Sequence, residues 1–155
     1  MNSELKKEYV MRMSHANNVQ MIIISYEIIE TYLDEAYEAT EQKAFVENVD
    51  MAKRCIDEMM NNLHYEYNLA KTLKELYLYM KRRLRKSVWE NDKEIIAEVK
   101  KIIISLRNSY KSIEEVDKSE SLMKNTQSVM TGITYGRNQI LDELSQDVSN
   151  RGYRV

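Results

Sequence analysis

Two histidines and one cysteine are the residues available for metal binding or nucleophilic catalysis in this chain of 155 residues. A di-iron site in a helical bundle needs Glu and His three residues apart on facing helices. The residues three positions before His15 and His64 are Arg12 and Asn61, so neither histidine completes such a pair. The sequence therefore predicts no ferritin-like metal site, and we expect no cofactor.

His64 keeps one alternative open, a histidine phosphotransfer bundle, which needs an exposed imidazole on a helix face. A partly exposed histidine without a chemical role is the simpler interpretation. Cys55 lies among apolar positions and is predicted to be a small buried side chain. No glycine precedes residue 132, so the chain has no glycine-rich loop for binding phosphate before that point. We therefore expect that the protein is not an enzyme.

A run of cations is the candidate patch for nucleic acid, and binding of nucleic acid is a further alternative function. A protein that binds nucleic acid over its surface is usually basic, whereas the net charge here is −2. Cations near the end of a helix are favoured by its dipole, and the acidic faces of the helices predicted over 17–39 and 44–66 can pair with them. We therefore expect no nucleic-acid partner. The run consists of Lys81, Arg82, Arg83, Arg85 and Lys86.

The elements that position these residues are predicted to be helices. The chain has no proline, and its three glycines all follow residue 131. Apolar residues recur at the spacing of three and four that places side chains on one helix face. This spacing predicts helices over about 17–39, 44–66, 69–89 and 92–117. Short links between them favour an all-α, antiparallel up-down-up-down four-helix bundle over residues 1–117.

The ends of the chain and of the helices carry weaker signals. Residues 1–15 are predicted to form a short N-terminal arm or a short helix lying on the bundle. Ser14, Asn17 and Asn18 are candidate caps for the first bundle helix, and Asn91 with Glu94 has the spacing of a capping box for the last. Residues 118–155 are predicted to form a C-terminal extension with a short amphipathic helix, whose apolar positions are Ile140, Leu141, Leu144 and Val148.

The helix predicted over 17–39 has more apolar surface than one packed face uses. Its first stripe consists of Val19, Ile22, Ile23, Tyr26, Ile29, Leu33, Ala36 and Tyr37. A second stripe lies about 100° round the helix and consists of Met21, Ile24, Ile28 and Tyr32. A helix that is apolar on most sides must be buried on most sides. This helix is therefore either the most enclosed of the bundle or has a second face for another chain.

The chain also has ten methionines and eleven tyrosines. Met adapts its shape, and Tyr combines a large apolar body with a polar tip. Tyr77, Leu78 and Tyr79 face more than one way on their predicted helix. Together with the second stripe, they suggest a bundle that receives an apolar helical segment in a groove.

Between Asp50 and Ile113 the sequence resembles the FliS family of flagellar export chaperones. The similarity is densest over Leu73–Leu84, which follows the family pattern Leu-x-x-Leu-Tyr-x-Tyr-Met-x-Arg-Arg-Leu. Ser25, Tyr26 and Glu27 are similar to the family's Leu-Tyr-Asp-Gly motif. The chain departs from the family at Asn18, where the family has proline, and at Ile28, where it has glycine.

The resemblance implies a chaperone of flagellum assembly and protein secretion that binds the C-terminal, helix-forming segment of flagellin. It would prevent premature polymerisation and assist delivery to the cytoplasmic domain of the flagellar export gate. Residues 1–20 lack the apolar core of a signal peptide, and no run has the roughly 20 apolar residues of a membrane span. We expect a cytoplasmic monomer or weak homodimer without membrane insertion. The predicted partner-binding residues are Met21, Ile24, Tyr26, Ile28, Tyr32, Tyr77 and Tyr79.

The C-terminal extension is expected to interact with the bundle. It contains more apolar side chains than a solvated tail needs, among them Val129, Met130, Ile133 and Leu144. We expect part of 129–148 to pack on its own bundle or a neighbour's, in or beside the flagellin site. There it would compete with the client.

Overall fold

The computed structural model describes the backbone of residues 1–126 and the side chains of residues 1–118, and this part consists of helices without a strand. The all-α prediction is confirmed. The helices are α1 (Ser3–Ser14), α2 (Asn18–Glu38), α3 (Gln42–Asn61), α4 (Asn68–Glu90) and α5 (Lys93–Thr126).

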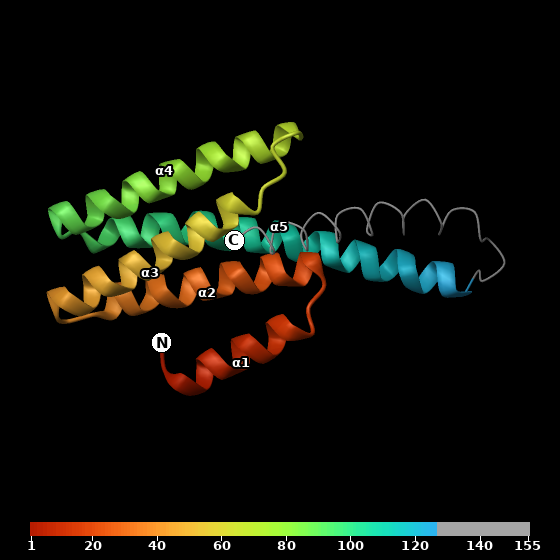
Figure 1. Cartoon of the computed structure of the whole chain (residues 1–155), viewed down its shortest axis with the longest axis horizontal. Coiled ribbons are helices and arrows are strands. Elements are labelled where there is room, and N and C mark those ends of the chain that lie inside the picture. The colour runs from red at the N-terminus through yellow and green to blue at the C-terminus, as the bar shows by residue number, and fades with distance from the viewer. Residues whose placement is uncertain (127–155) are drawn as a thin grey trace.

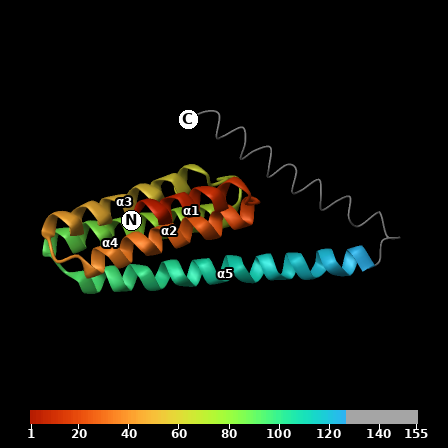
Figure 2. The ribbon, with the colours of Figure 1, turned by 90° about the horizontal axis from the view of Figure 1, so that it is seen from below.

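Helices α2 to α5 form a bundle in which consecutive helices run in alternating directions (Figure 1). Helix α2 packs against α3 and α5, and α4 packs against the same two helices, so α2 and α4 lie diagonally across the bundle. Helix α1 packs on α2 outside this arrangement. Seen from below, α5 continues beyond the ends of the other helices (Figure 2).

The core is built from the apolar faces that the helical spacing predicts. Each bundle helix contributes at least three large, fully buried side chains, and burial of one such side chain contributes about 1.5–3 kcal/mol. Helix α2 also carries acidic residues toward α5, where Lys100 pairs with Asp34 at 2.5 Å and Arg107 pairs with Glu30. The buried set is Tyr26, Ile29, Leu33, Phe45, Val49, Ile56, Tyr77, Met80, Leu84, Ile96, Val99 and Ile103.

Of the three candidate caps for α2 the structure has Asn17, whereas the cap predicted for α5 is wrong. The Gln20 amide donates to Asn17 Oδ1 at 2.9 Å, and the Asn17 amide donates to Gln20 Oε1 at 3.0 Å. Asn91 instead ends α4 with φ of 51°, in the left-handed region that asparagine tolerates better than most residues. The cap of α5 is Asp92, whose Oδ1 accepts the Glu94 amide at 2.9 Å.

Two predicted boundaries also change, and one open alternative is decided. Of the arm and the short helix expected at the N-terminus, residues 3–14 form the helix, capped by Asn2, whose side chain accepts the Leu5 amide at 2.8 Å. Helix α3 ends at Asn61, and residues 62–67 link it to α4. The boundary predicted at 117 falls inside α5, where no glycine or proline interrupts the helix. The expected packing of 129–148 lies outside the described residues.

Within residues 1–126, no helix combines the length and the apolar character needed to cross a lipid bilayer.

Candidate partner interface

Helix α2 is the most enclosed helix of the described part, because α1, α3 and α5 all pack on it. Its second apolar stripe is covered in this structure. Ile24 is 4% exposed and Tyr32 is 7% exposed, while Met21 and Ile28 are half-buried. Tyr32 belongs to the main core, whereas Ile24 lies outside that cluster. The two stripes therefore differ in what covers them, and part of the second stripe faces α1.

Helix α1 covers this part of α2 through a few polar contacts. The Tyr9 hydroxyl lies 3.0 Å from Thr31 Oγ1, and Arg12 pairs with Glu27 at 2.6 Å. The N-terminal ammonium of Met1 pairs with Glu35 farther along α2. Tyr9 is the buried residue of α1, while Val10 and Met11 are largely exposed. Helix α1 is thus attached along one face and contributes little to the main core.

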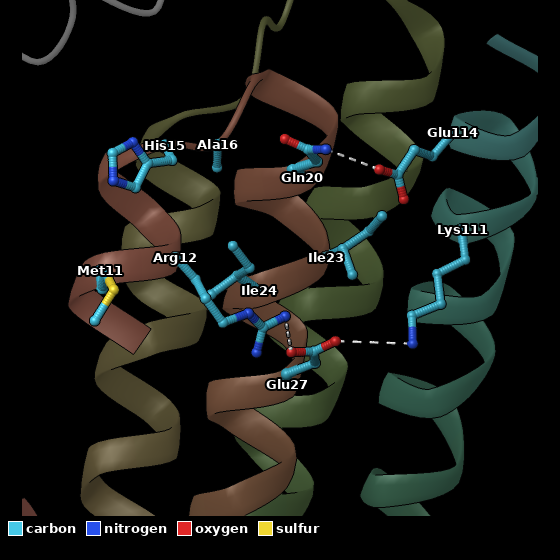
Figure 3. Close-up of a pocket in the computed structure, with 10 residues that line it drawn as sticks. All are labelled: Met11, Arg12, His15, Ala16, Gln20, Ile23, Ile24, Glu27, Lys111 and Glu114. Atoms are coloured by element: carbon cyan, nitrogen blue, oxygen red, sulfur yellow. Dashed lines mark hydrogen bonds and ion pairs between the residues drawn. The ribbon is translucent and has the colours of Figure 1, made fainter. Parts of the chain in front are cut away.

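A cleft of about 550 Å³ lies where α1, α2 and α5 meet (Figure 3). Ile23 and Ile24 form its apolar floor, with Ile24 directed toward α1 and Ile23 toward α5. Polar bridges cross it at two levels. Gln20 donates to Glu114 at 3.0 Å at one level, and Arg12 and Lys111 both pair with Glu27 at the other, with Lys111 at 3.7 Å.

The surroundings of Glu114 in the cleft favour the charged form of its carboxyl. Hydrogen bonds from Gln20 and Lys118 hold the pKa of the Glu114 carboxyl below its usual value. Glu27 is 18% exposed and is shared by two cations. A partner that enters the cleft therefore has to bring polar groups for this rim or leave the bridges in place. An amphipathic segment with an apolar centre and polar edges meets that requirement.

Three tyrosines meet deeper in the bundle. The hydroxyls of Tyr26 and Tyr77 are hydrogen-bonded at 2.5 Å, and the ring of Tyr110 lies 5.8 Å from that of Tyr26. Burial raises the pKa of Tyr77 to about 12, although its hydrogen bond with Tyr26 opposes the rise. Burial also raises the pKa of Tyr26 well above its ordinary value. Tyr26 and Tyr77 are fully enclosed, whereas Tyr79 is 37% exposed on the outer side of α4.

The basic run on α4 divides into paired and unpaired cations. Lys81 pairs with Asp57 of α3, and Arg83 donates to Glu98 of α5 at 2.8 Å and 2.6 Å. The pair of Lys81 with α3 agrees with the expectation, whereas Arg83 finds its partner on α5, outside the two helices expected to supply one. Arg82 and Arg85 remain exposed, and within residues 1–118 neither forms an ion pair.

The residues considered for catalysis do not form a reactive constellation among the described side chains. The side chain of His64 is 13% exposed and lies in the link between α3 and α4, not on a helix face as phosphotransfer requires. Cys55 is half-buried, and burial raises the pKa of its thiol. Among the described residues, no group of three acidic, histidine or cysteine side chains is placed to hold a metal ion.

Sequence reasoning missed the contacts of α1. Their signal is the spacing of Tyr9 and Arg12, which lie on one helix face opposite acidic and hydroxyl positions of α2. On α4, Trp89 is 90% exposed, because it lies sixteen residues after the buried Leu73 and so on the opposite side of the helix.

Comparisons with known proteins agree with this architecture. The comparison with curated proteins gives no match. The family model described as flagellar protein FliS matches residues 1–117, which is most of the chain and includes α1 and the bundle core. The match also spans Leu73–Leu84, the segment that carries the family-like pattern. The chain belongs to the FliS family of flagellar export chaperones.

Proposed function

We propose that this protein is a cytoplasmic chaperone for flagellin. It binds the C-terminal, helix-forming segment of its client, prevents polymerisation before export, and assists delivery to the cytoplasmic domain of the export gate. Membership of the FliS family supports the export role. The observation that supports a helical client is Ile24 of the second stripe of α2, an apolar side chain outside the main core that α1 covers.

The proposed binding mode is a helix in a groove. An amphipathic client helix buries its apolar face on α2, while its polar edges meet Glu27 of α2 and Lys111 and Glu114 of α5 at the rim of the cleft. The client gains free energy from burial of apolar surface and loses part of it in ordering its own chain. Catalysis has no part in this role.

Access to the stripe depends on α1. Ile24 is 4% exposed beneath it, so a client helix reaches Ile24 only if α1 leaves α2. The contacts that it would break are mainly polar and lie at the edge of the protein, which makes α1 a suitable element for exchange. Met21, Ile24 and Ile28 are the proposed contacts on α2, and Tyr79 is a proposed contact on α4. Tyr26, Tyr32 and Tyr77 are proposed to support the groove from the core.

Calorimetry with purified flagellin tests the proposal. Full-length flagellin should bind with one-to-one stoichiometry, and flagellin lacking its C-terminal segment should bind much more weakly. Equal affinity for the two forms would contradict the proposed client segment. Failure of both to bind would contradict flagellin as the client.

A further inference from the structure

The solvent side of α4 carries a regular row of exposed residues, which we call the outer stripe. Successive members are four, three, four, three and four residues apart, the heptad spacing that keeps side chains on one face of a helix. Leu73, Met80 and Leu84 point the opposite way into the core. The stripe consists of Lys71, Glu75, Leu78, Arg82, Arg85 and Trp89.

Nothing in the described part of the chain covers this stripe. Helix α4 packs on α3 and α5, and its other side lies at the edge of the bundle (Figure 1). Trp89 is 90% exposed and Leu78 is 37% exposed. Leu78 lies eleven residues, about three turns, before Trp89 on the same face. An exposed tryptophan on a regular helix face is typical of an interaction surface.

The charges of the stripe are also unpaired. Within residues 1–118, neither Glu75 nor Lys71, Arg82 or Arg85 forms an ion pair, although neighbouring Lys81, Arg83 and Lys86 do. The stripe therefore presents one carboxylate and three cations in fixed order along a rigid helix. A partner that satisfies this order must place a cation opposite Glu75 and acceptors or apolar surface opposite the rest.

We infer that the outer stripe binds the same stripe of a second copy of this chain, with the two α4 helices antiparallel. The two-fold axis passes between the helices at the level of residue 80. This register places Glu75 opposite Arg85 of the second copy, because the two positions are equally far from residue 80. It also places Leu78 against the aliphatic stem of Arg82 and Lys71 near the ring of Trp89. The two-fold symmetry makes each of these contacts twice.

Other arrangements of the two stripes are less favourable. A parallel pair places every residue opposite its own copy, so Arg85 meets Arg85 and Glu75 meets Glu75. Moving the antiparallel register by one heptad takes Glu75 away from Arg85 and leaves one end of each stripe without a partner. The register centred on residue 80 uses all six positions. Because cations outnumber the carboxylate, repulsion between the two faces keeps the dimer weak.

Sedimentation of the full chain over a wide concentration range tests this inference, with the emission of Trp89 as an independent readout. Trp89 is the single tryptophan, so its spectrum reports on the stripe alone. We expect reversible dimers at high concentration, together with a shift of the emission to shorter wavelength. A chain that remains monomeric, with Trp89 in water at every concentration, would overturn the inference and leave the stripe for another partner.

Charge reversal tests the register. Arg85→Glu and Glu75→Arg should each raise the dimer dissociation constant by about tenfold, because each turns two attractions into repulsions. The double variant should recover most of the affinity, since it restores both pairs with exchanged signs. Lys43→Glu at the exposed start of α3 changes the net charge as Arg85→Glu does and should have little effect. A double variant no better than the single ones would overturn the proposed pairing.

Circular dichroism identifies any variant that fails to fold, and Arg82→Leu provides a further check of opposite sign. This change removes an unpaired cation from the seam and adds apolar surface opposite Leu78, so the dimer should become tighter. Weaker association of Arg82→Leu would contradict the placement of Arg82 against Leu78.

Discussion

The stability of the bundle depends on the hydrogen bond between the buried hydroxyls of Tyr26 and Tyr77. Replacing either one by Phe leaves the other hydroxyl buried without its partner, at a cost of about 1–3 kcal/mol in the free energy of unfolding. The double variant Tyr26→Phe and Tyr77→Phe removes both polar groups and should be more stable than the sum of the single effects predicts. Urea denaturation of the four proteins measures this coupling. Strict additivity would show that the hydrogen bond contributes nothing.

The same pair predicts loss of stability in alkali. The pKa of Tyr77 rises from 10.0 to about 12 on folding, so the folded state favours the neutral phenol. Below pH 10 the phenol of Tyr77 is neutral in both the folded and the unfolded protein, and its contribution to stability is fully present. Above pH 10 the unfolded state loses its proton first, and the contribution decreases until the pH passes about 12. Denaturation curves at increasing pH should show a smaller alkaline loss for Tyr77→Phe than for the parent protein.

The buried residues of α2 were easier to predict from the sequence than the helices that cover them. The first stripe of α2 contains the buried residues Ile23, Tyr26, Ile29 and Leu33, but Ile24 and Tyr32 of the second stripe are buried too. The spacing could not assign Tyr32 to the core. Helical periodicity says on which side of α2 a side chain lies, but not how much of that side the neighbouring helices cover. Asn91 shows a second limit, since asparagine serves both as an N-cap and as a left-handed helix end. Only the packing of α4 against α5 decides between them.

Among the elements, α1 should open independently of the bundle. Ile24→Asp places a charge beneath α1, outside the main core, and should release α1 while α2–α5 stay folded. Ile29→Asp is the matched change in the main core of the same helix, where the side chain is fully buried. It should unfold the whole bundle. Hydrogen exchange resolved along the chain distinguishes the two outcomes, and global unfolding by both variants would show that α1 and the bundle form one cooperative unit.

The helices themselves were largely predictable. Absence of proline and of early glycine, together with regular apolar spacing, places α2, α4 and the start of α5 within a few residues. The missed boundaries differ in cause. Helix α5 continues past 117 because no breaker interrupts it, whereas helix α3 ends at Asn61 without a glycine or proline to end it. Helix α1 has weak amphipathic spacing, so its helical form depends on a cap and on contacts with α2 that lie outside its own sequence.

For the whole molecule, the proposed exchange of α1 for a client predicts a gain of affinity when α1 is loosened. Arg12→Glu replaces the ion pair with Glu27 by repulsion and should strengthen flagellin binding severalfold, because the open form becomes more populated. Lys7→Glu makes the same charge change at an exposed position of α1 and should leave the affinity unchanged. Calorimetry compares the two. Equal affinities for both variants and the parent protein would argue that α1 does not cover the client site.

The position of α2 between α3 and α5 also has a consequence for synthesis on the ribosome. Helix α3 follows α2 directly and can cover one side soon after both emerge, but the side facing α5 waits for Ile96, Val99 and Ile103. More than half of the described chain must therefore be translated while an apolar surface of α2 stays open to the cytosol. A nascent chaperone in this state is itself an aggregation-prone chain. Helix α1 does not cover this surface, because it packs on the side of α2 that carries Ile24, whereas Ile23 points toward α5 (Figure 3).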